Sequence, residues 1–85
     1  MKKYYLYILR REDGYLYTGI TSDLEIRIGQ HRNGLCRNTK NHGRISLVFK
    51  KSFNNIKAAA EKEKEIKGWR REKKEILIEE AAYSE

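Results

Sequence analysis

The sequence has little of several features that would indicate a particular class of protein. It contains a single cysteine, Cys36, so it can form no internal disulfide. One cysteine with two histidines also argues against a structural zinc site. No stretch approaches the roughly 20 apolar residues that a membrane-spanning helix needs. The apolar run near the start is too short for a signal peptide, and Arg10 and Arg11 close it. We therefore expect a soluble, cytoplasmic protein.

Acidic residues are also few, because 12 Asp and Glu stand against 19 Lys and Arg and leave a formal charge of +7. Such a charge indicates a polyanionic partner, although a small domain can carry it simply as a solubilising surface. The chain of 85 residues is expected to form one domain, residues 1–85. A chain of this length buries only about 60–65% of its unfolded surface, so its core should be small.

Two aromatic and β-branched segments, residues 4–10 and 15–20, predict a β-hairpin around Glu12-Asp13-Gly14. The length of the turn decides which tyrosines share a face. A two-residue turn would leave Tyr7 on the opposite face from Tyr17. A three-residue loop with a left-handed Gly14 would instead place four tyrosines on one face: Tyr5, Tyr7, Tyr15 and Tyr17. We favour the second register, because such a face suits a partly wet, functional surface.

A helix is expected next, capped by Ser22 or Asp23 and ended by Gly34. Four of its residues recur at spacings of three or four and share one broad face: Leu24, Arg27, Ile28 and His31. Arg27 and His31 therefore border the apolar stripe that packs on the sheet. These two side chains either serve a site there or extend outward into water.

A basic loop follows, residues 32–44, with Arg32, Arg37, Lys40 and Arg44. The next strand, residues 45–53, should place Leu47 and Phe49 on one face and Val48 on the other. Two helices complete the chain. The first runs from Asn54 or Asn55 to about Gly68, and the second covers about residues 70–80 with Ile76 and Leu77 on its inner side.

Glu63 lies within the apolar stripe of the first of these two helices, between Ala59 and Ile66. A carboxylate in that position costs free energy unless it is paired, solvated or bound to a metal ion. Glu61 and Glu65 lie off the stripe and are interpreted as ordinary solvated charges.

Several of these segments, in this order, resemble the GIY-YIG nuclease family. Tyr5-Leu6-Tyr7 and Tyr17-Thr18-Gly19 match its two triplets, and residues 23–27 with His31 match its helix motif. Residues 63–69 resemble the C-terminal signature of the small stand-alone bacterial members, which are similar to the N-terminal domain of an excision-repair nuclease. The resemblance covers nearly the whole chain, and several spaced motifs are far more specific than one triplet.

The resemblance implies an α+β fold, a small three-stranded antiparallel sheet flanked by about three helices. It also implies cleavage of phosphodiester bonds with one divalent metal ion, Mg²⁺ or Mn²⁺. Carried over position by position, it assigns five catalytic residues: Tyr7, Tyr17, Arg27, His31 and Glu63. Glu63 would be the metal ligand, and Gly19 matches a triplet glycine whose missing side chain allows close backbone approach.

The chain departs from the family pattern in three places. The first triplet lacks its glycine and isoleucine, Ile20 replaces a lysine of the repair-type members, and no asparagine follows Asn55. These departures bear on rate and substrate range more than on the fold.

In the mechanism that these residues permit, Glu63 would hold the metal ion and Arg27 would pair with the phosphate oxygens. Tyr7 is the first candidate to orient or deprotonate the attacking water, with Tyr17 or His31 assisting, and the sequence leaves open which of the three takes the proton. The basic loop would bind flanking phosphates through four side chains: Arg32, Arg37, Lys40 and Arg44.

The hypothesis from sequence is thus a metal-dependent endonuclease acting on nucleic acid, with DNA as the working substrate, in repair or recombination. Its specificity would be weak, or supplied by a partner protein. Two alternatives remain: a non-catalytic nucleic-acid-binding module that retains the fold, and an interaction module whose tyrosine face binds protein. The presence of Tyr7, Tyr17, Arg27 and Glu63 argues against loss of catalysis.

Overall fold

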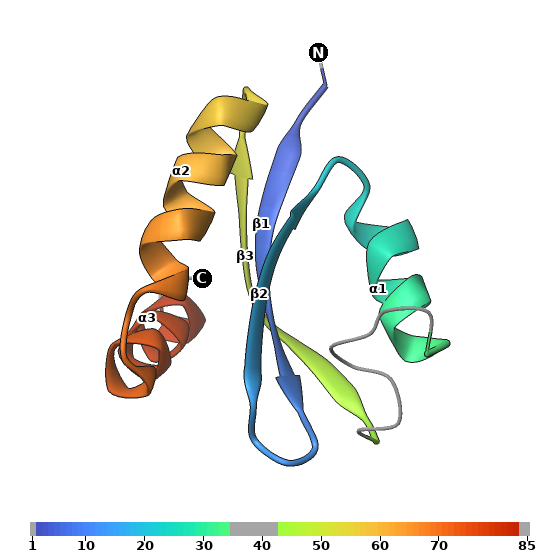
Figure 1. The fold of residues 1–85 in the computed structure, drawn as a ribbon, viewed down its shortest axis with the longest axis vertical. Helices are drawn as coiled ribbons and strands as arrows, with labels where there is room; N and C mark the ends of the chain where they lie inside the picture. The colour runs from blue at the N-terminus through green and yellow to red at the C-terminus, as the bar shows by residue number, and fades with distance from the viewer. Residues whose placement is uncertain (1, 35–42, 84–85) are drawn as a thin grey trace.

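The computed structural model of the chain describes residues 2–34 and 43–83. It contains three strands and three helices (Figure 1): β1 (Tyr4–Arg11), β2 (Leu16–Thr21), α1 (Leu24–Arg32), β3 (Ile45–Phe53), α2 (Ile56–Lys67) and α3 (Arg71–Tyr83). The strands form one antiparallel sheet in the order β2-β1-β3. This α+β architecture confirms the fold class that the sequence predicts. No helix among the described residues is both long and apolar enough to cross a membrane.

The hairpin between β1 and β2 has the three-residue loop that we favoured. The Arg11 backbone N–H donates to the Tyr15 carbonyl at 2.9 Å, and the Gly14 N–H donates to the Arg11 carbonyl at 2.8 Å. Gly14 has a φ of 92°, a left-handed conformation that glycine adopts without strain. Leu9 accordingly pairs with Tyr17 and Tyr7 with Gly19. Tyr7 and Tyr17 therefore project from the same face of the sheet.

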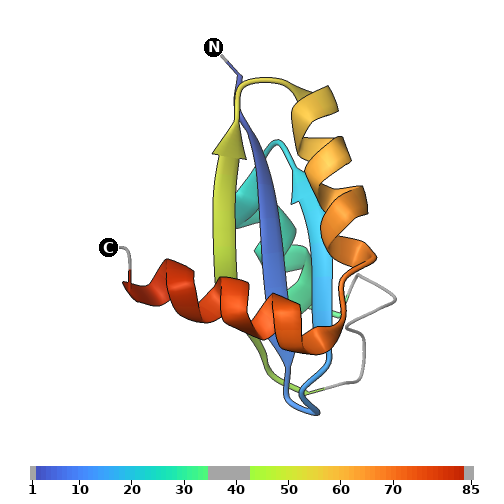
Figure 2. The ribbon, with the colours of Figure 1, turned by 90° about the vertical axis from the view of Figure 1, so that its left-hand side faces the viewer.

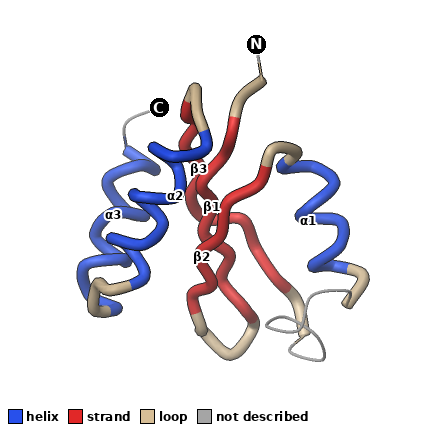
Figure 3. The backbone as a smooth tube through the Cα atoms, turned by 45° about the horizontal axis from the view of Figure 1, so that its top comes forward, coloured by secondary structure: helices blue, strands red, loops and turns tan. Residues whose placement is uncertain are grey.

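Strand β1 is buried on both faces because it is the central strand and helices cover both sides (Figures 1 and 3). Leu6 and Ile8 pack with Ile66 beneath α2 and α3, whereas Tyr7 and Leu9 pack beneath α1. All four of these β1 side chains are 0% exposed. A strand covered on both faces has no need for polar alternation, which explains the unbroken apolar run in its sequence.

The pairing of β1 with β3 contains a bulge, which overturns one prediction. Ile8 pairs with Phe49 and Leu9 pairs with Leu47, so Val48 is the extra residue. Val48 and Phe49 both pack against the core beneath α2 and α3, and Leu47 packs on the α1 side. The expectation that Leu47 and Phe49 share a face was therefore wrong, because a strict two-residue period does not survive a bulge.

The helix ends follow capping rules, which fix how each helix leaves the sheet. The Asp23 side chain accepts from the Ile26 N–H at 3.1 Å, and Asn55 accepts from Ala58 at 2.8 Å. Gly34 has a φ of 74° just beyond the end of α1, as a helix-terminating glycine should. Of the alternatives left open, Asp23 and Asn55 are the caps.

Helix α3 crosses the three strands (Figure 2), and an ion pair links it to β1. Arg10 on β1 donates to both Glu75 oxygens, at 2.8 and 2.7 Å, and these hydrogen bonds lower the pKa of the Glu75 carboxyl. Leu77 and Ile78 pack on the core, but Ile76 is 55% exposed. The prediction that Ile76 lies on the inner side was therefore wrong, and Ile78 takes that role.

Candidate functional site

Four of the five predicted catalytic residues meet on the α1 side of the sheet. Tyr7 comes from the middle of β1, Tyr17 from β2, and Arg27 and His31 from α1. The Tyr7 Oη lies 3.1 Å from His31 Nε2, and the Arg27 Nε donates to the same Oη at 3.3 Å. We call these four residues the phenol cluster. Its centre is the Tyr7 oxygen, which has a guanidinium on one side and an imidazole on the other.

The three rings of the phenol cluster pack against one another. The ring centroids of Tyr17 and His31 are 5.1 Å apart, those of Tyr7 and His31 are 5.8 Å apart, and those of the two tyrosines are 6.2 Å apart. The angles between ring planes, 44° to 70°, are tilted or edge-on arrangements that aromatic rings prefer. Each ring therefore restricts the orientation of the other two.

Gly19 allows the Tyr7 ring to lie over β2. An added Cβ at Gly19 would be 2.7 Å from Tyr7 Oη, closer than real Cβ atoms approach a neighbour, and in tight contact with Tyr17 Cε2 at 3.2 Å. The cross-strand pairing of Tyr7 with Gly19 thus places the phenol over a β2 residue that has no side chain. On α1, the spacing of four between Arg27 and His31 brings both onto the face that meets this phenol.

The surroundings of His31 favour its neutral form. Burial, and to a lesser extent the positive charge of Arg27, lower the pKa of the His31 imidazole from its ordinary value of 6.5. Only 2% of the His31 surface is exposed. Because a guanidinium can only donate, the Tyr7 oxygen accepts from Arg27, and its own hydrogen can be donated to Nε2 when the imidazole proton is on Nδ1. In this arrangement the Tyr7 hydroxyl bridges the Arg27 guanidinium and the His31 imidazole.

Solvent reaches only part of the phenol cluster. Tyr7 is 0% exposed, whereas Tyr17 and Arg27 are half-buried. Tyr17 and Arg27 are therefore the members of the cluster that solvent reaches, whereas Tyr7 and His31 are buried. Arg27 is also held by Gln30, whose side-chain oxygen accepts from Nη1 at 3.2 Å. Sequence reasoning missed Gln30, although its spacing of three from Arg27 on one helix was a usable signal.

Glu63 lies on the other side of the sheet, on α2 (Figures 1 and 3). It occupies the inner stripe between the buried Ala59 and Ile66, its side chain is 21% exposed, and its Oε2 is 3.2 Å from Lys67 Nζ. The structure thus brings Tyr7, Tyr17, Arg27 and His31 together but places Glu63 across the sheet from them. The expectation that all five line one surface is not met for Glu63.

The donor set can still accommodate one hydrated Mg²⁺. The residues that the structure describes contain no group of three or more His, Cys, Asp and Glu side chains, which excludes an all-protein metal cage among them. Mg²⁺ needs only one or two carboxylates, with water and substrate phosphates as its other ligands. On the β2 face beneath α2, the buried Thr18 hydroxyl has no hydrogen-bond partner among those residues. Glu63, which is 21% exposed, is the side chain that would hold such an ion, whereas the Thr18 hydroxyl is too deeply buried to meet its water shell.

The comparison with known proteins settles the family. The sequence model of the GIY-YIG catalytic domain matches residues 3–75. The chain belongs to the GIY-YIG family. UPF0213 protein SSP2268 of Staphylococcus saprophyticus is 42% identical to it over 81 residues, which cover 94% of this chain and 99% of that protein. The names of such relatives state no activity.

Two solved structures share the GIY-YIG fold of this chain. The solution NMR structure of UPF0213 protein BH0048 from Bacillus halodurans matches with a TM-score of 0.61 and 37% identity. The match covers 91% of this chain and 83% of that protein. Protein EF2693 from E. faecalis, also solved by NMR, matches with a TM-score of 0.70 and 25% identity. The match covers 100% of this chain and 92% of that protein.

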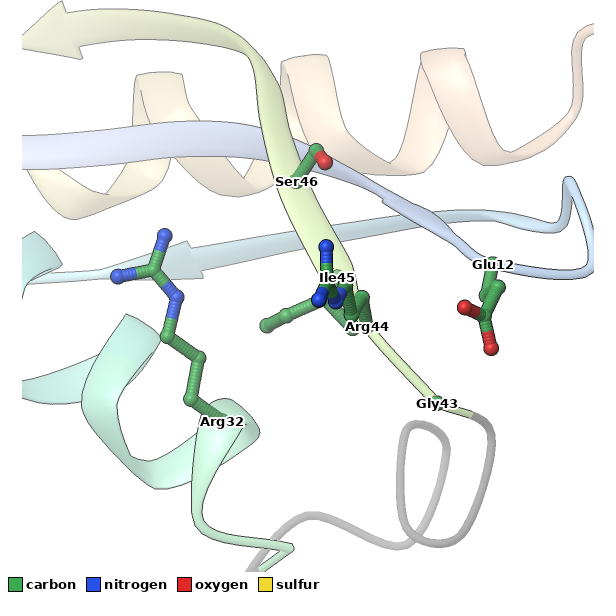
Figure 4. Close-up of a pocket in the computed structure, with 6 residues that line it drawn as sticks. All are labelled: Glu12, Arg32, Gly43, Arg44, Ile45 and Ser46. Carbon is green, nitrogen blue, oxygen red and sulfur yellow. The ribbon is translucent and has the colours of Figure 1, made fainter.

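Two of the four predicted nucleic-acid-binding residues line one pocket. Arg32 ends α1 and Arg44 precedes β3, and together with Glu12, Gly43, Ile45 and Ser46 they line an open pocket of about 480 Å³ (Figure 4). Arg37 and Lys40 lie outside the described residues. Sequence reasoning treated Glu12 only as part of a turn and missed its place in this pocket, because no local pattern links the hairpin to residues 43–46.

Substituting Gly19 by alanine should disrupt the phenol cluster. The new methyl would overlap the Tyr7 phenol, so we expect Gly19→Ala to lower the free energy of unfolding by about 1–3 kcal/mol. Gly29→Ala on α1 is the matched control, because a Cβ there meets nothing within 4 Å. It should raise the free energy of unfolding by about 0.5–1 kcal/mol through helix propensity. Urea unfolding measures both, and equal effects of the two substitutions would contradict the packing described above.

The lowered pKa of His31 predicts that acid destabilises the fold. The unfolded imidazole takes up a proton near pH 6.5, whereas the folded one resists protonation until a lower pH. Within that window the unfolded state binds more protons, so the free energy of unfolding falls as the pH falls and levels off below the folded pKa.

Urea unfolding of the native chain and of His31→Gln, from about pH 7.5 to about pH 5, tests this dependence. Both chains retain His42 and all carboxylates, so the difference between their profiles isolates His31. We expect the profiles to diverge below about pH 6.5, with the native chain losing more stability. Parallel profiles would mean that His31 titrates alike in the folded and unfolded states.

Proposed function

We propose that this protein is a divalent-metal-dependent endonuclease that hydrolyses phosphodiester bonds in DNA. One observation carries the proposal: in a member of the GIY-YIG nuclease family, the Tyr7 phenol is hydrogen-bonded to both Arg27 and His31. Hydrolysis of a phosphodiester needs a place for the proton of the attacking water and a positive charge for the phosphate. The phenol cluster supplies both within one set of contacts.

Arg27 is the residue that contacts the phosphate. It is half-buried, so its guanidinium is partly desolvated yet reachable from solvent. A guanidinium forms two parallel hydrogen bonds to non-bridging phosphate oxygens and cannot lose its charge. Its bonds to Tyr7 and Gln30 fix the planar group before the substrate arrives. This preorganisation lowers the reorganisation that the transition state would otherwise require.

The remaining three residues of the cluster handle the proton. Tyr17 is half-buried and packs on both Tyr7 and His31, so its phenol is placed to orient the water. As the water loses its proton to the Tyr7 oxygen, the Tyr7 hydrogen passes to His31 Nε2, and the hydroxide formed attacks phosphorus. Because Tyr7 is 0% exposed and Arg27 is held by Tyr7 and Gln30, the Tyr17 side chain must shift on substrate binding to admit that water.

Glu63 is the residue that would hold the divalent ion, Mg²⁺ or Mn²⁺. When bound, such an ion would supply Lewis-acid charge to a phosphate oxygen. Because Glu63 lies across the sheet from Arg27, α2 would have to approach the phenol cluster for that charge to reach the phosphate at Arg27. Glu63 now pairs with Lys67 at 3.2 Å, so metal binding would replace that contact. An ion pair that is partly exposed contributes little to stability, and its exchange is correspondingly easy.

A second candidate function is a non-catalytic DNA-binding module. The position of Glu63 favours it, since the carboxylate is paired with Lys67 and lies across the sheet from the phenol cluster. The two functions differ in turnover, not in binding. Measuring cleavage and binding separately therefore distinguishes them.

Glu63→Gln tests the proposal because it keeps the side-chain shape and removes the charge that Mg²⁺ requires. We expect nicking of supercoiled DNA with Mg²⁺ to fall about 100-fold or more. Binding in chelator should be unchanged or slightly tighter, since the substitution removes one negative charge from the protein. Arg27→Ala should lose both cleavage and affinity, because its phosphate contact exists before and during the reaction. Nicking and gel-shift assays measure the two properties.

The matched control is Glu65→Gln on the same helix, an exposed carboxylate that pairs with Lys62. It should nick and bind as the native chain does. Full activity in Glu63→Gln would remove the metal-ligand role of Glu63. A native chain that binds DNA but never nicks it would instead favour the binding module.

A further inference from the structure

The pocket of Figure 4 is built from three separate segments of the chain. Glu12 comes from the β1–β2 turn, Arg32 from the end of α1, and Gly43, Arg44, Ile45 and Ser46 from the segment that begins β3. We call it the turn pocket. Its volume of about 480 Å³ falls within the range of pockets that hold small ligands, roughly 300–1,000 Å³.

The turn pocket contains charges of both signs that do not pair with each other. Among residues 2–34 and 43–83, the side chains of Glu12, Arg32 and Arg44 form no hydrogen bond or ion pair. Elsewhere the opposite holds, because Arg10 pairs with Glu75 and Arg11 with Asp13. Figure 4 shows the Glu12 carboxylate on one side of the segment leading into β3 and the Arg32 guanidinium on the other, with Arg44 between them. The pocket is therefore cationic at one end and anionic at the other.

The position of Glu12 depends on a glycine. Gly43 has a φ of 78°, and an added Cβ there would meet the Glu12 carboxyl carbon at 2.9 Å and would overlap its oxygen. The carboxyl group thus occupies the space that any other residue at position 43 would fill. Gly43, in a backbone conformation that glycine adopts easily, thus leaves room for the Glu12 carboxyl group beside the pocket.

The turn pocket adjoins the phenol cluster. Ile45 lines the pocket, is only 9% exposed, and packs in the same apolar cluster as Tyr7 and Leu9. Arg32 directly follows His31 on α1. In a nucleic-acid strand that has one phosphate at Arg27, the neighbouring nucleotide would therefore lie at the opening of the turn pocket.

We propose that the turn pocket receives one unpaired nucleotide of the substrate, next to the bond that is cut. This inference rests on the proposed function and names the substrate class of the same site. The nucleotide phosphate lies against Arg32 and Arg44, because guanidinium groups recognise phosphate. Its base lies toward Glu12, because a carboxylate accepts from a base amino group, such as cytosine N4, and repels a second phosphate.

The nucleotide must be unpaired, because a base in a duplex already uses its Watson–Crick edge and is stacked between its neighbours. Proteins read bases in pockets by taking them from single strands or by extruding them. The preferred substrates are then flaps, ends and single-stranded segments, and a continuous duplex is a poor one.

Binding in chelator tests the turn pocket without requiring cleavage. The probes are oligomers of deoxycytidine and of thymidine of equal length, and a duplex of that length. The native chain should bind the deoxycytidine oligomer about fivefold or more tightly than the thymidine oligomer, whose bases present a carbonyl oxygen in place of the amino group. The duplex should bind more weakly than the deoxycytidine oligomer. Glu12→Gln should abolish the preference for cytosine, and Glu72→Gln, on α3, should keep it.

The double variant Arg32→Ala with Arg44→Ala tests the cationic end. It should weaken binding of both oligomers alike and reduce the salt dependence by about one charge. The control is Lys57→Ala with Lys64→Ala on α2, an equal loss of charge from exposed side chains, which should leave the affinities near the native values.

The possible outcomes separate this inference from the proposed function. Equal affinity for cytosine and thymine oligomers, or a preference that survives Glu12→Gln, would overturn the contact with Glu12. If duplex bound as tightly as single strands, the requirement for an unpaired nucleotide would be wrong. If the arginine double variant bound as the native chain does, the phosphate contact with Arg32 and Arg44 would be wrong. A native chain that shows the expected binding but never cuts DNA would contradict the nuclease proposal and leave the turn pocket established.

Discussion

The hydrogen bonds of the Tyr7 phenol to His31 and Arg27 are the contacts on which the site depends. Helix α1 has nine residues and only a narrow apolar stripe, Leu24 and Ile28, to pack on the sheet. The phenol adds two polar contacts at fixed positions along that stripe. Because Tyr7 is 0% exposed on the central strand, these contacts are made in a poorly hydrated environment. Loss of one partner there would leave a buried polar group unsatisfied and lower the free energy of unfolding. The same bonds that hold α1 thus set the geometry of the proposed chemistry.

A small core explains why structure and function share these residues. The chain has two thin apolar layers, one on each side of β1, and neither is large. The layer beneath α1 contains an imidazole and two phenols where a larger protein would place aliphatic side chains. Satisfied polar groups specify one arrangement of a core more sharply than apolar groups do. Burial in this layer, together with the charge of Arg27, also lowers the pKa of His31 and so keeps its imidazole neutral.

Local rules carried the sequence analysis a long way. The hairpin register followed from Gly14 and the tyrosines, and the shared face of Arg27 and His31 followed from their spacing on a helix. Both depend on residues near one another in the chain. The inward position of Glu63 on α2 was also predicted, since it follows from the period of one helix.

The features that sequence could not supply involve relations between distant elements. Val48 forms a bulge because of how β3 meets β1, and nothing in the strand sequence marks it. The location of Glu63 depends on which face of the sheet α2 covers. The spacing of apolar residues along a helix does not predict that face. The turn pocket combines Glu12, Arg32 and Arg44 from three segments, so its charges meet only in the folded chain.

The protonation state of the His31 ring tests the central claim most directly. Nitrogen chemical shifts of the two imidazole nitrogens at pH 7, measured by NMR on the native chain and on Tyr7→Phe, report where the proton is. The account predicts a neutral ring with its proton on Nδ1 and an unprotonated Nε2 that accepts from Tyr7, and a change at Nε2 in Tyr7→Phe. A protonated ring, or a proton on Nε2, would contradict the proposed transfer from Tyr7 to His31.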